Sequence, residues 1–222
     1  MQTETLKPVI SVLLVEDHPM FRERLASIIS KRGDMAVCAE ADNVQDALRC
    51  AEGLRPNIAI VDISLRGSNG LDFLKDLKAR GIDLPVLVLS MHDEAIYAER
   101  VLRAGARGYI TKYEASSEVM AAIEQVLNGH VYLSRQMTSR MLGLFADAKK
   151  GDPRDVSALT DRELDVFQRL GRGETARDIA SALHVGITTI DTYRARIKEK
   201  LGLKNGNELQ RRAMEWARDN PA

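Results

Sequence analysis

The sequence predicts two domains of different class: an α/β domain of five βα units, followed by a smaller all-α domain. The chain has 222 residues, near the size at which two compact cores are expected rather than one. Between residues 9 and 128, short apolar runs alternate with segments of helical period, which is typical of a parallel sheet covered by helices on both faces. Beyond residue 160 only the helical period remains, which predicts the all-α domain.

The first domain is expected to hold five strands and five helices. The strands are short apolar runs, and the helices repeat apolar residues three and four positions apart. In chain order, the strands are expected at residues 9–15, 35–41, 57–61, 84–90 and 107–110, and the helices at 19–31, 44–53, 70–80, 93–103 and 116–128. We therefore assign residues 8–131 to this domain.

A linker and the second domain follow. Strand signals stop after His130, and a short amphipathic helix then runs into a polar breaker cluster, so residues 132–156 are predicted as a linker. Four helices joined by short turns are expected in a domain of residues 157–222. They are predicted at 161–170, 175–183, 187–201 and 206–218.

Composition narrows the class of protein. Hydrophobic residues make up 45% and charged residues 29%, an ordinary globular balance. The sequence has no apolar run of about 18 residues and no leader pattern, so we expect a cytoplasmic protein with no membrane contact. Cys38 and Cys50 have no metal or disulfide spacing and are expected to be buried, reduced thiols. Residues from Lys150 onward include 14 basic and 12 acidic side chains, a weak indication of nucleic-acid binding.

Polar residues lie at the ends of four predicted strands. The carboxyl ends of parallel strands meet at one edge of a sheet, where ligands bind. Three carboxylates there repel one another unless a cation is present, and oxygen ligands beside a phosphoryl group suit Mg²⁺. Asp62 is the expected nucleophile toward phosphorus, with the metal, Ser90 and Lys112 holding the phosphoryl oxygens. The residues at these strand ends are Glu16, Asp17, Asp62, Ser90, Thr111 and Lys112.

The alternative is that these side chains are helix caps or surface charges. Asp17 and Ser90, each just before a helical stretch, fit the N-cap position when taken alone. Four matching strand ends make coincidence improbable for the set, although the alternative stays open for each residue.

These strand ends resemble those of the receiver domain of response regulators, over residues 9–128. The matching segments are Val-Leu-Leu-Val-Glu-Asp-His at 12–18, Ile-Val-Asp-Ile-Ser-Leu at 60–65, Leu-Val-Leu-Ser at 87–90 and Gly-Tyr-Ile-Thr-Lys at 108–112. The resemblance implies a flavodoxin-like fold with strand order 2-1-3-4-5.

The same resemblance implies a role for each site residue. Asp62 is the phosphorylated residue, and Asp17, Asp62 and the Ser64 carbonyl hold Mg²⁺, with Glu16 acting through water. Ser90 and Tyr109 form the switch that responds to phosphorylation. The sequence departs from the family pattern at Arg66 and Tyr113, where proline is common, and these departures concern loop conformation.

Residues 175–201 have the pattern of a helix-turn-helix. Ile190, Ile197 and Leu201 form the expected core stripe of its second helix, which leaves small and polar residues facing outward for close approach to a DNA groove, with basic residues beside them for phosphates. A solvated basic helix in an ordinary bundle is the alternative. The expected DNA-binding residues are Arg177, Thr188, Thr189, Asp191, Thr192, Arg194, Ala195, Arg196 and Lys198.

Residues 159–214 resemble a LuxR-type helix-turn-helix domain, so the whole chain resembles the NarL/FixJ class of response regulators. The resemblance implies a DNA-binding transcription regulator of a two-component system, not an enzyme. Its implied partners are a sensor histidine kinase, double-stranded DNA and a second copy of the chain in a homodimer. Asp191 and Ala195 stand where the family often has basic residues. Asp191 is thus either a base-reading acceptor or an acid favoured by the helix dipole.

Two other functions fit part of the sequence. A metal-dependent phosphohydrolase or phosphotransferase also forms a phospho-aspartate, but the haloacid dehalogenase-like enzymes place a second carboxylate where this chain has Ser64. In the other alternative, the DNA-binding domain is retained and the first domain serves as an unphosphorylated dimerisation platform.

Overall fold

A computed structural model of the chain describes residues 9–65, 68–91, 94–146 and 156–219. The chain divides into two compact units, Met1–Leu142 and Gly143–Ala222, which are described separately below. Within the described residues, no helix is both long enough and apolar enough to span a membrane.

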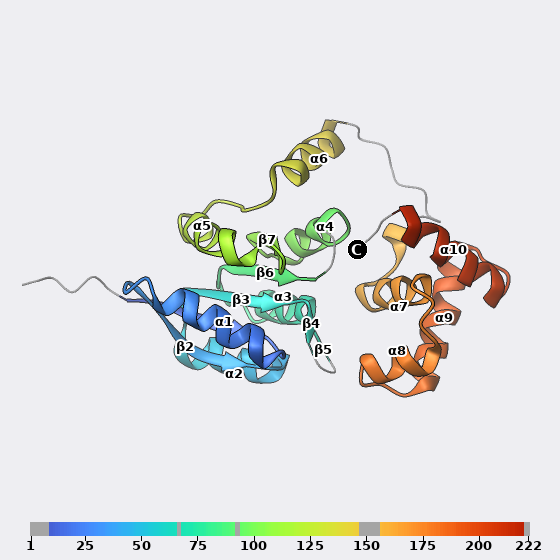
Figure 1. Cartoon of the computed structure of the whole chain (residues 1–222), viewed down its shortest axis with the longest axis horizontal. Helices are drawn as coiled ribbons and strands as arrows, with labels where there is room; N and C mark the ends of the chain where they lie inside the picture. The colour runs from blue at the N-terminus through green and yellow to red at the C-terminus, as the bar shows by residue number, and fades with distance from the viewer. Residues whose placement is uncertain (1–8, 66–67, 92–93, 147–155, 220–222) are drawn as a thin grey trace, which may run out of the picture. The chain divides into compact units, whose positions relative to one another are not determined.

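The first unit contains a five-stranded sheet in the order β2-β1-β3-β6-β7 (Figure 1). All four pairings are parallel, which confirms the predicted fold and strand order. Helices α1 and α5 pack against one face of the sheet, while α2, α3 and α4 lie side by side on the other. The strands are β1 (Ile10–Val15), β2 (Met35–Ala41), β3 (Ile58–Asp62), β6 (Val86–Ser90) and β7 (Gly108–Thr111). The helices are α1 (Pro19–Ser30), α2 (Val44–Leu54), α3 (Gly70–Ala79), α4 (Glu94–Ala104) and α5 (Ala115–Leu127).

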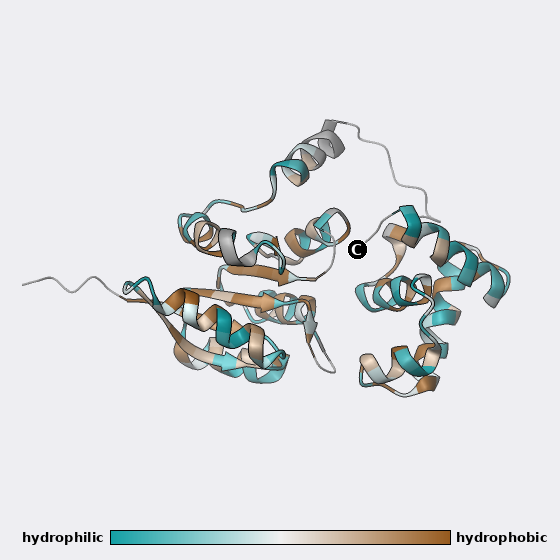
Figure 2. Ribbon diagram, in the orientation of Figure 1, coloured by the Kyte–Doolittle hydropathy of each residue, from teal (hydrophilic) through white to brown (hydrophobic). Residues whose placement is uncertain are grey.

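The central strands are buried along their whole length. Every residue of β3 and β6 is buried, and so are the last four residues of β1. Figure 2 shows these strands as continuously hydrophobic ribbon between helices of mixed colour. Helices cover both faces, so apolar runs rather than alternating residues form the strands, and the polar strand ends are fixed on a rigid layer.

The expectation that both cysteines are buried was wrong. Cys38 is exposed and Cys50 is half-buried, and both are free thiols. Side chains of β2 alternate between exposed and half-buried positions over most of its length, because an edge strand has a neighbour on one side only.

Three short elements of the first unit escaped the sequence analysis. A hairpin of β4 (Ser64–Leu65) and β5 (Ser68–Asn69) follows β3. Tyr132 forms a bridge with Gly108, so the expectation that strand pairing ends at His130 was wrong. The Tyr132 N–H donates to the Arg107 carbonyl at 2.9 Å, and the Tyr109 N–H donates to the Tyr132 carbonyl at 3.0 Å.

The segment after this bridge is also attached to the first unit. The Ser134 N–H donates to Glu94 Oε1 at 2.8 Å, and Met137 of α6 (Arg135–Ala146) is buried. Gly108 permits the close approach of this segment, because a Cβ there would lie 2.8 Å from Leu87 Cδ1 and 3.2 Å from Tyr132 Cβ.

The second unit is all helical, as predicted. Thr160 and Thr175 begin α7 and α8 with capping boxes completed by Glu163 and Asp178. The core holds Phe167, whose ring meets the Trp216 ring edge-on at 5.9 Å between centroids. The elements are the 3₁₀ turn η1 (Val156–Ala158), α7 (Asp161–Gly171), α8 (Ala176–Ala182), α9 (Ile187–Leu201) and α10 (Gly206–Asp219).

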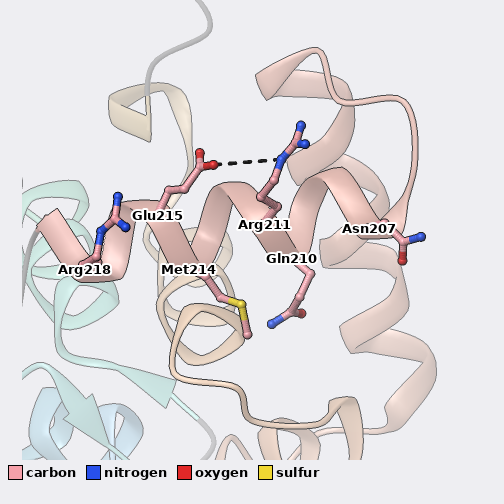
Figure 3. Close-up of a pocket in the computed structure, with 6 residues that line it drawn as sticks. All are labelled: Asn207, Gln210, Arg211, Met214, Glu215 and Arg218. Atoms are coloured by element: carbon pink, nitrogen blue, oxygen red, sulfur yellow. Dashed lines mark ion pairs between the residues drawn. The ribbon is translucent and has the colours of Figure 1, made fainter.

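Helix α10 has a buried side and an exposed side. Leu209 is buried, and Trp216 packs on Phe167, so both belong to the core of this unit. A shallow pocket runs along the opposite side of the helix (Figure 3). It is lined by Asn207, Gln210, Arg211, Met214, Glu215 and Arg218.

Candidate functional sites

Three buried carboxylates meet at the carboxyl edge of the sheet. Glu16 and Asp17 directly follow β1, and Asp62 is the last residue of β3. Together with His18, each offers one ligand atom, and these atoms lie within 4.8 Å of one another. The structure therefore brings together the three acidic residues that the sequence analysis assigned to one crevice, and their oxygen atoms are ligands of the kind that a hard divalent cation prefers.

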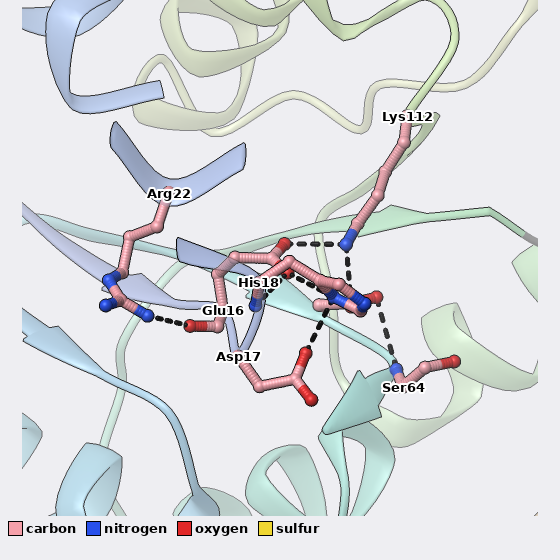
Figure 4. A network of polar contacts seen from close by, with 7 residues as sticks. Glu16, Asp17, His18, Arg22, Ser64 and Lys112 are labelled. Atoms are coloured by element: carbon pink, nitrogen blue, oxygen red, sulfur yellow. Dashed lines mark hydrogen bonds and ion pairs between the residues drawn. The ribbon is translucent and has the colours of Figure 1, made fainter. Parts of the chain in front are cut away.

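Lys112 lies between two of these carboxylates. Its Nζ atom is 2.7 Å from Glu16 Oε2 and 2.7 Å from Asp62 Oδ2. Figure 4 shows the Lys112 side chain pointing toward Glu16. The Phe21 ring covers the ammonium group, with 4.6 Å from Nζ to the ring centroid. Burial acts to lower the pKa of Lys112, but the Asp62 and Glu16 carboxylates outweigh burial and raise it above the ordinary value.

The charges of this crevice are unbalanced. Burial raises the pKa of Asp62 to about 6 against the opposing charge of Lys112, and the Glu16 carboxylate acts in the same direction as burial. Three carboxylates face a single ammonium group, so the site fits a cation better than it fits protein groups alone.

The backbone around Asp62 is shaped by its neighbours. The Ser64 N–H donates to Asp62 Oδ1 at 3.1 Å. Gly70 lies so close that a Cβ there would be 2.2 Å from the Asp62 carbonyl oxygen. Gly70 was not singled out from the sequence, although a glycine at a helix start after a polar loop was the available signal.

Ser90 and Tyr109, the expected switch residues, are both buried, Ser90 at the carboxyl end of β6 and Tyr109 within β7 opposite Val88. Ser90 ends β6 opposite Thr111 of β7, and its carbonyl accepts the Lys112 N–H at 2.7 Å. Neither Ser90 nor Asp17 caps a helix: the N-cap of α1 is His18, and α4 begins four residues after Ser90. The helix-cap alternative is therefore wrong for both.

Two further residues touching the crevice were missed from the sequence. His18 Nδ1 lies 3.1 Å from Glu16 Oε1 and 2.9 Å from Asp17 Oδ1. Arg22 Nη1 donates to the Glu16 carbonyl at 2.7 Å and so fixes the backbone of the acidic pair. No sequence pattern predicts these contacts, because they depend on how α1 lies over the end of β1.

The second site is the outward face of α9. Ile190, Ile197 and Leu201 are buried, as the period predicted. Thr189, Arg194 and Lys198 are half-buried along the flanks. The exposed residues on or beside the outward face are Arg177 of α8 and Thr188, Asp191, Thr192, Ala195 and Arg196 of α9.

One basic residue of α9 belongs to the fold. Lys200 Nζ lies 2.7 Å from Glu163 Oε2 of α7, so this ammonium group joins two helices of the unit. Burial acts to raise the pKa of Glu163, but hydrogen bonds from Lys200 and Thr160 outweigh burial and hold it below its ordinary value.

Comparisons with known proteins agree for both units. Residues 12–124 match the profile of the response regulator receiver domain, and residues 157–213 match that of the bacterial regulatory proteins of the luxR family. The virulence factors putative positive transcription regulator BvgA of Bordetella pertussis is 34% identical over 198 residues, which cover 89% of this chain and 93% of the relative.

Solved structures of response regulators have a fold similar to that of this chain. A two-component response regulator of the LuxR family from Aurantimonas sp. has a TM-score of 0.58 and 29% identity, covering 63% of this chain and 99% of that chain. RcsB from Salmonella enterica serovar Typhimurium, solved bound to a promoter, has a TM-score of 0.60 over 93% of this chain and 98% of that chain. Its identity is 22%, so it supports the fold alone.

Proposed function

Because the chain belongs to the two-component response regulators that join a receiver domain to a LuxR-type DNA-binding domain, we propose that phosphorylation of Asp62 controls its binding to DNA. The protein is a transcription regulator and not an enzyme. In this proposal the receiver spans residues 8–131, the linker 132–156 and the DNA-binding domain 157–222.

The observation that carries the proposal is the setting of the Asp62 carboxylate. One oxygen accepts from Lys112 and the other from the Ser64 N–H, at the end of a fully buried strand. An Asp62 oxygen attacks the phosphorus of a phosphohistidine on a sensor kinase. The new P–O bond forms as the P–N bond breaks, and the imidazole leaves.

Mg²⁺ is the cation that this donor set fits. Asp17, Asp62 and the Ser64 carbonyl would hold it, with Glu16 acting through water. When bound, it supplies positive charge against the phosphoryl oxygens. Lys112 then transfers its hydrogen bond from the carboxylate to a phosphoryl oxygen, and the Ser90 hydroxyl binds another.

The output is a change on the surface of the receiver. As Ser90 moves toward the phosphoryl group, Tyr109 moves into the space beside it, and β7 carries the change to the surface. This change promotes a homodimer, which presents two DNA-binding domains to one promoter. Helix α9 enters the major groove, where Thr188, Asp191, Thr192 and Ala195 face bases. On the flanks, Thr189, Arg177, Arg194, Arg196 and Lys198 serve mainly the phosphates.

The proposal is tested by labelling the full chain with acetyl phosphate and Mg²⁺. We expect a label that hydroxylamine removes in the natural protein and none in Asp62→Asn. Chelation of Mg²⁺ is expected to abolish labelling. Asp83→Asn, which changes an exposed aspartate of the same unit, is the matched control and keeps the label. Full labelling of Asp62→Asn contradicts the proposal.

A further inference from the structure

A carboxylate occupies an outward position on the helix proposed to read DNA. The Asp191 side chain is 60% exposed, near the amino-terminal end of α9. Its neighbours on this face are Thr188, Thr192 and Ala195, which are exposed and small. An acidic group here faces a polyanion, and this arrangement weakens binding to DNA of any sequence.

Helix stability does not explain why an acidic residue stands at position 191. Helix α9 begins at Ile187 and has no acidic residue in its first turn, so the charge lies beyond the region where the helix dipole stabilises an acid. Among the residues that the structure describes, its carboxylate contacts Arg194, whose Nη1 atom is 3.4 Å from Asp191 Oδ1. An exposed pair of this length and spacing adds little to helix stability.

We propose that Asp191 is a specificity-determining residue that accepts a hydrogen bond from the N4 amino group of a cytosine in the major groove. This inference rests on the proposed function, in which α9 lies in that groove. Cytosine presents an amino donor on its major-groove edge, whereas guanine and thymine present acceptors that repel a carboxylate. Adenine pairs its amino donor with the N7 acceptor and favours an amide over a carboxylate.

The surroundings of Asp191 suit this contact. The Thr192 hydroxyl donates to the Thr188 carbonyl at 2.9 Å, so it is turned toward the helix backbone. Arg194, 34% exposed, holds one carboxylate oxygen from its own helix and offsets part of the charge. Arg196 and Lys198 lie on the same helix and supply phosphate contacts that compensate for the repulsion.

The test is selection of bound duplexes from a random-sequence pool by the full chain activated with Mg²⁺ and beryllofluoride. We compare the natural protein with Asp191→Asn and with the control Glu199→Gln. Glu199 is an exposed acid two turns further along α9, so the control makes the same charge change away from the amino-terminal end that contacts bases.

We expect the natural protein to select a cytosine at one position and to bind that duplex about tenfold more tightly than its adenine variant. Asp191→Asn is expected to reverse the preference toward adenine, because an amide pairs with adenine N6 and N7. The Glu199→Gln variant is expected to keep the preference for cytosine. Trp216 fluorescence, which reports the fold of this unit, is expected to be unchanged in both variants.

An unchanged base preference in Asp191→Asn at every position of the site overturns the inference while leaving the proposed function standing. If the natural protein selects no sequence at all, the proposed function fails instead.

Discussion

Asp62 and its neighbours hold more negative charge than the protein neutralises. Lys112 is shared between Asp62 and Glu16, and Asp17 lies in the same crevice. The pKa of Asp62 is raised to about 6, so keeping its carboxylate ionised in the folded state costs free energy at pH 7. The crevice proposed to accept the phosphoryl group is thus a place where the folded protein is destabilised locally.

Asp62→Asn is therefore expected to raise the free energy of unfolding of the receiver by about 1–3 kcal/mol at pH 7 in the presence of a chelator, because it removes one of the crowded charges. Urea denaturation followed by circular dichroism measures the change. Added Mg²⁺ is expected to narrow the difference, because the cation stabilises the natural protein more than the variant. A less stable variant in chelator contradicts this account.

The ionised carboxylate of Glu163 stabilises the fold, whereas that of Asp62 destabilises it. Its pKa is lowered from 4.5, so it contributes stability that is fully present above about pH 4.5 and is lost as the pH falls through the lower folded-state value. Glu163→Gln is expected to unfold more easily by about 1–2 kcal/mol at pH 7, with the difference shrinking below pH 4.5.

Fluorescence of Trp216, the single tryptophan of the chain, isolates the unfolding of this unit during a urea titration at each pH. Glu215→Gln is the control, because Glu215 is exposed and its contact with Arg211 is 4.0 Å long. Equal loss of stability at pH 4 and pH 7 in Glu163→Gln argues against a charged Glu163 as the source.

Among the elements, β7 is joined to the segment around Tyr132 by backbone hydrogen bonds on either side of Gly108. Gly108→Val places a branched side chain where Leu87 and Tyr132 already lie. We expect a loss of about 1–3 kcal/mol in receiver stability and faster hydrogen exchange at the Tyr109 and Tyr132 amides. Gly53→Ala, a helical glycine with open space at its Cβ, is the control and is expected to be neutral or slightly stabilising.

The elements differ in how far the sequence predicts them. Every main helix and strand boundary lies within two residues of its expected place, because long apolar periods and buried runs are strong local signals. The β4 and β5 strands are two residues each, and Tyr132 pairs as a single bridge, so none has a period to detect.

The same distinction holds for the sites. Strand ends converge in any parallel sheet, so the carboxylates, Ser90 and Lys112 were predictable as a group. His18, Arg22 and Phe21 contact them because of the path of α1, and Gly70 because of the hairpin after β3, which are properties of the folded chain. The contact of Lys200 is of the same kind, because its partner Glu163 lies on another helix.

At the scale of the whole molecule, the receiver is expected to control assembly and DNA affinity together. Beryllofluoride with Mg²⁺ is expected to shift the natural protein from monomer toward dimer and to tighten its promoter complex by about 5- to 150-fold, the usual range of coupling between sites. Sedimentation and DNA titration measure the two effects. Asp62→Asn is the matched variant and shows neither.

Equal DNA affinity with and without beryllofluoride supports the dimerisation platform instead. In that case the receiver surface assembles the protein without any change at Asp62. Labelling of Asp62 by acetyl phosphate would then occur without consequence for the promoter, so the two measurements together distinguish the two functions.

The bridge at Tyr132 also concerns solubility. Strand β7 is the outermost strand of its sheet, and its unpaired backbone groups would offer a template to a neighbouring chain. The backbone of Tyr132 makes hydrogen bonds with the Arg107 carbonyl and the Tyr109 N–H, which face this edge. A receiver cut at residue 131, where the sequence alone would end it, loses that cover and exposes a strand edge to aggregation, whereas one that continues through residue 142 keeps these two hydrogen bonds.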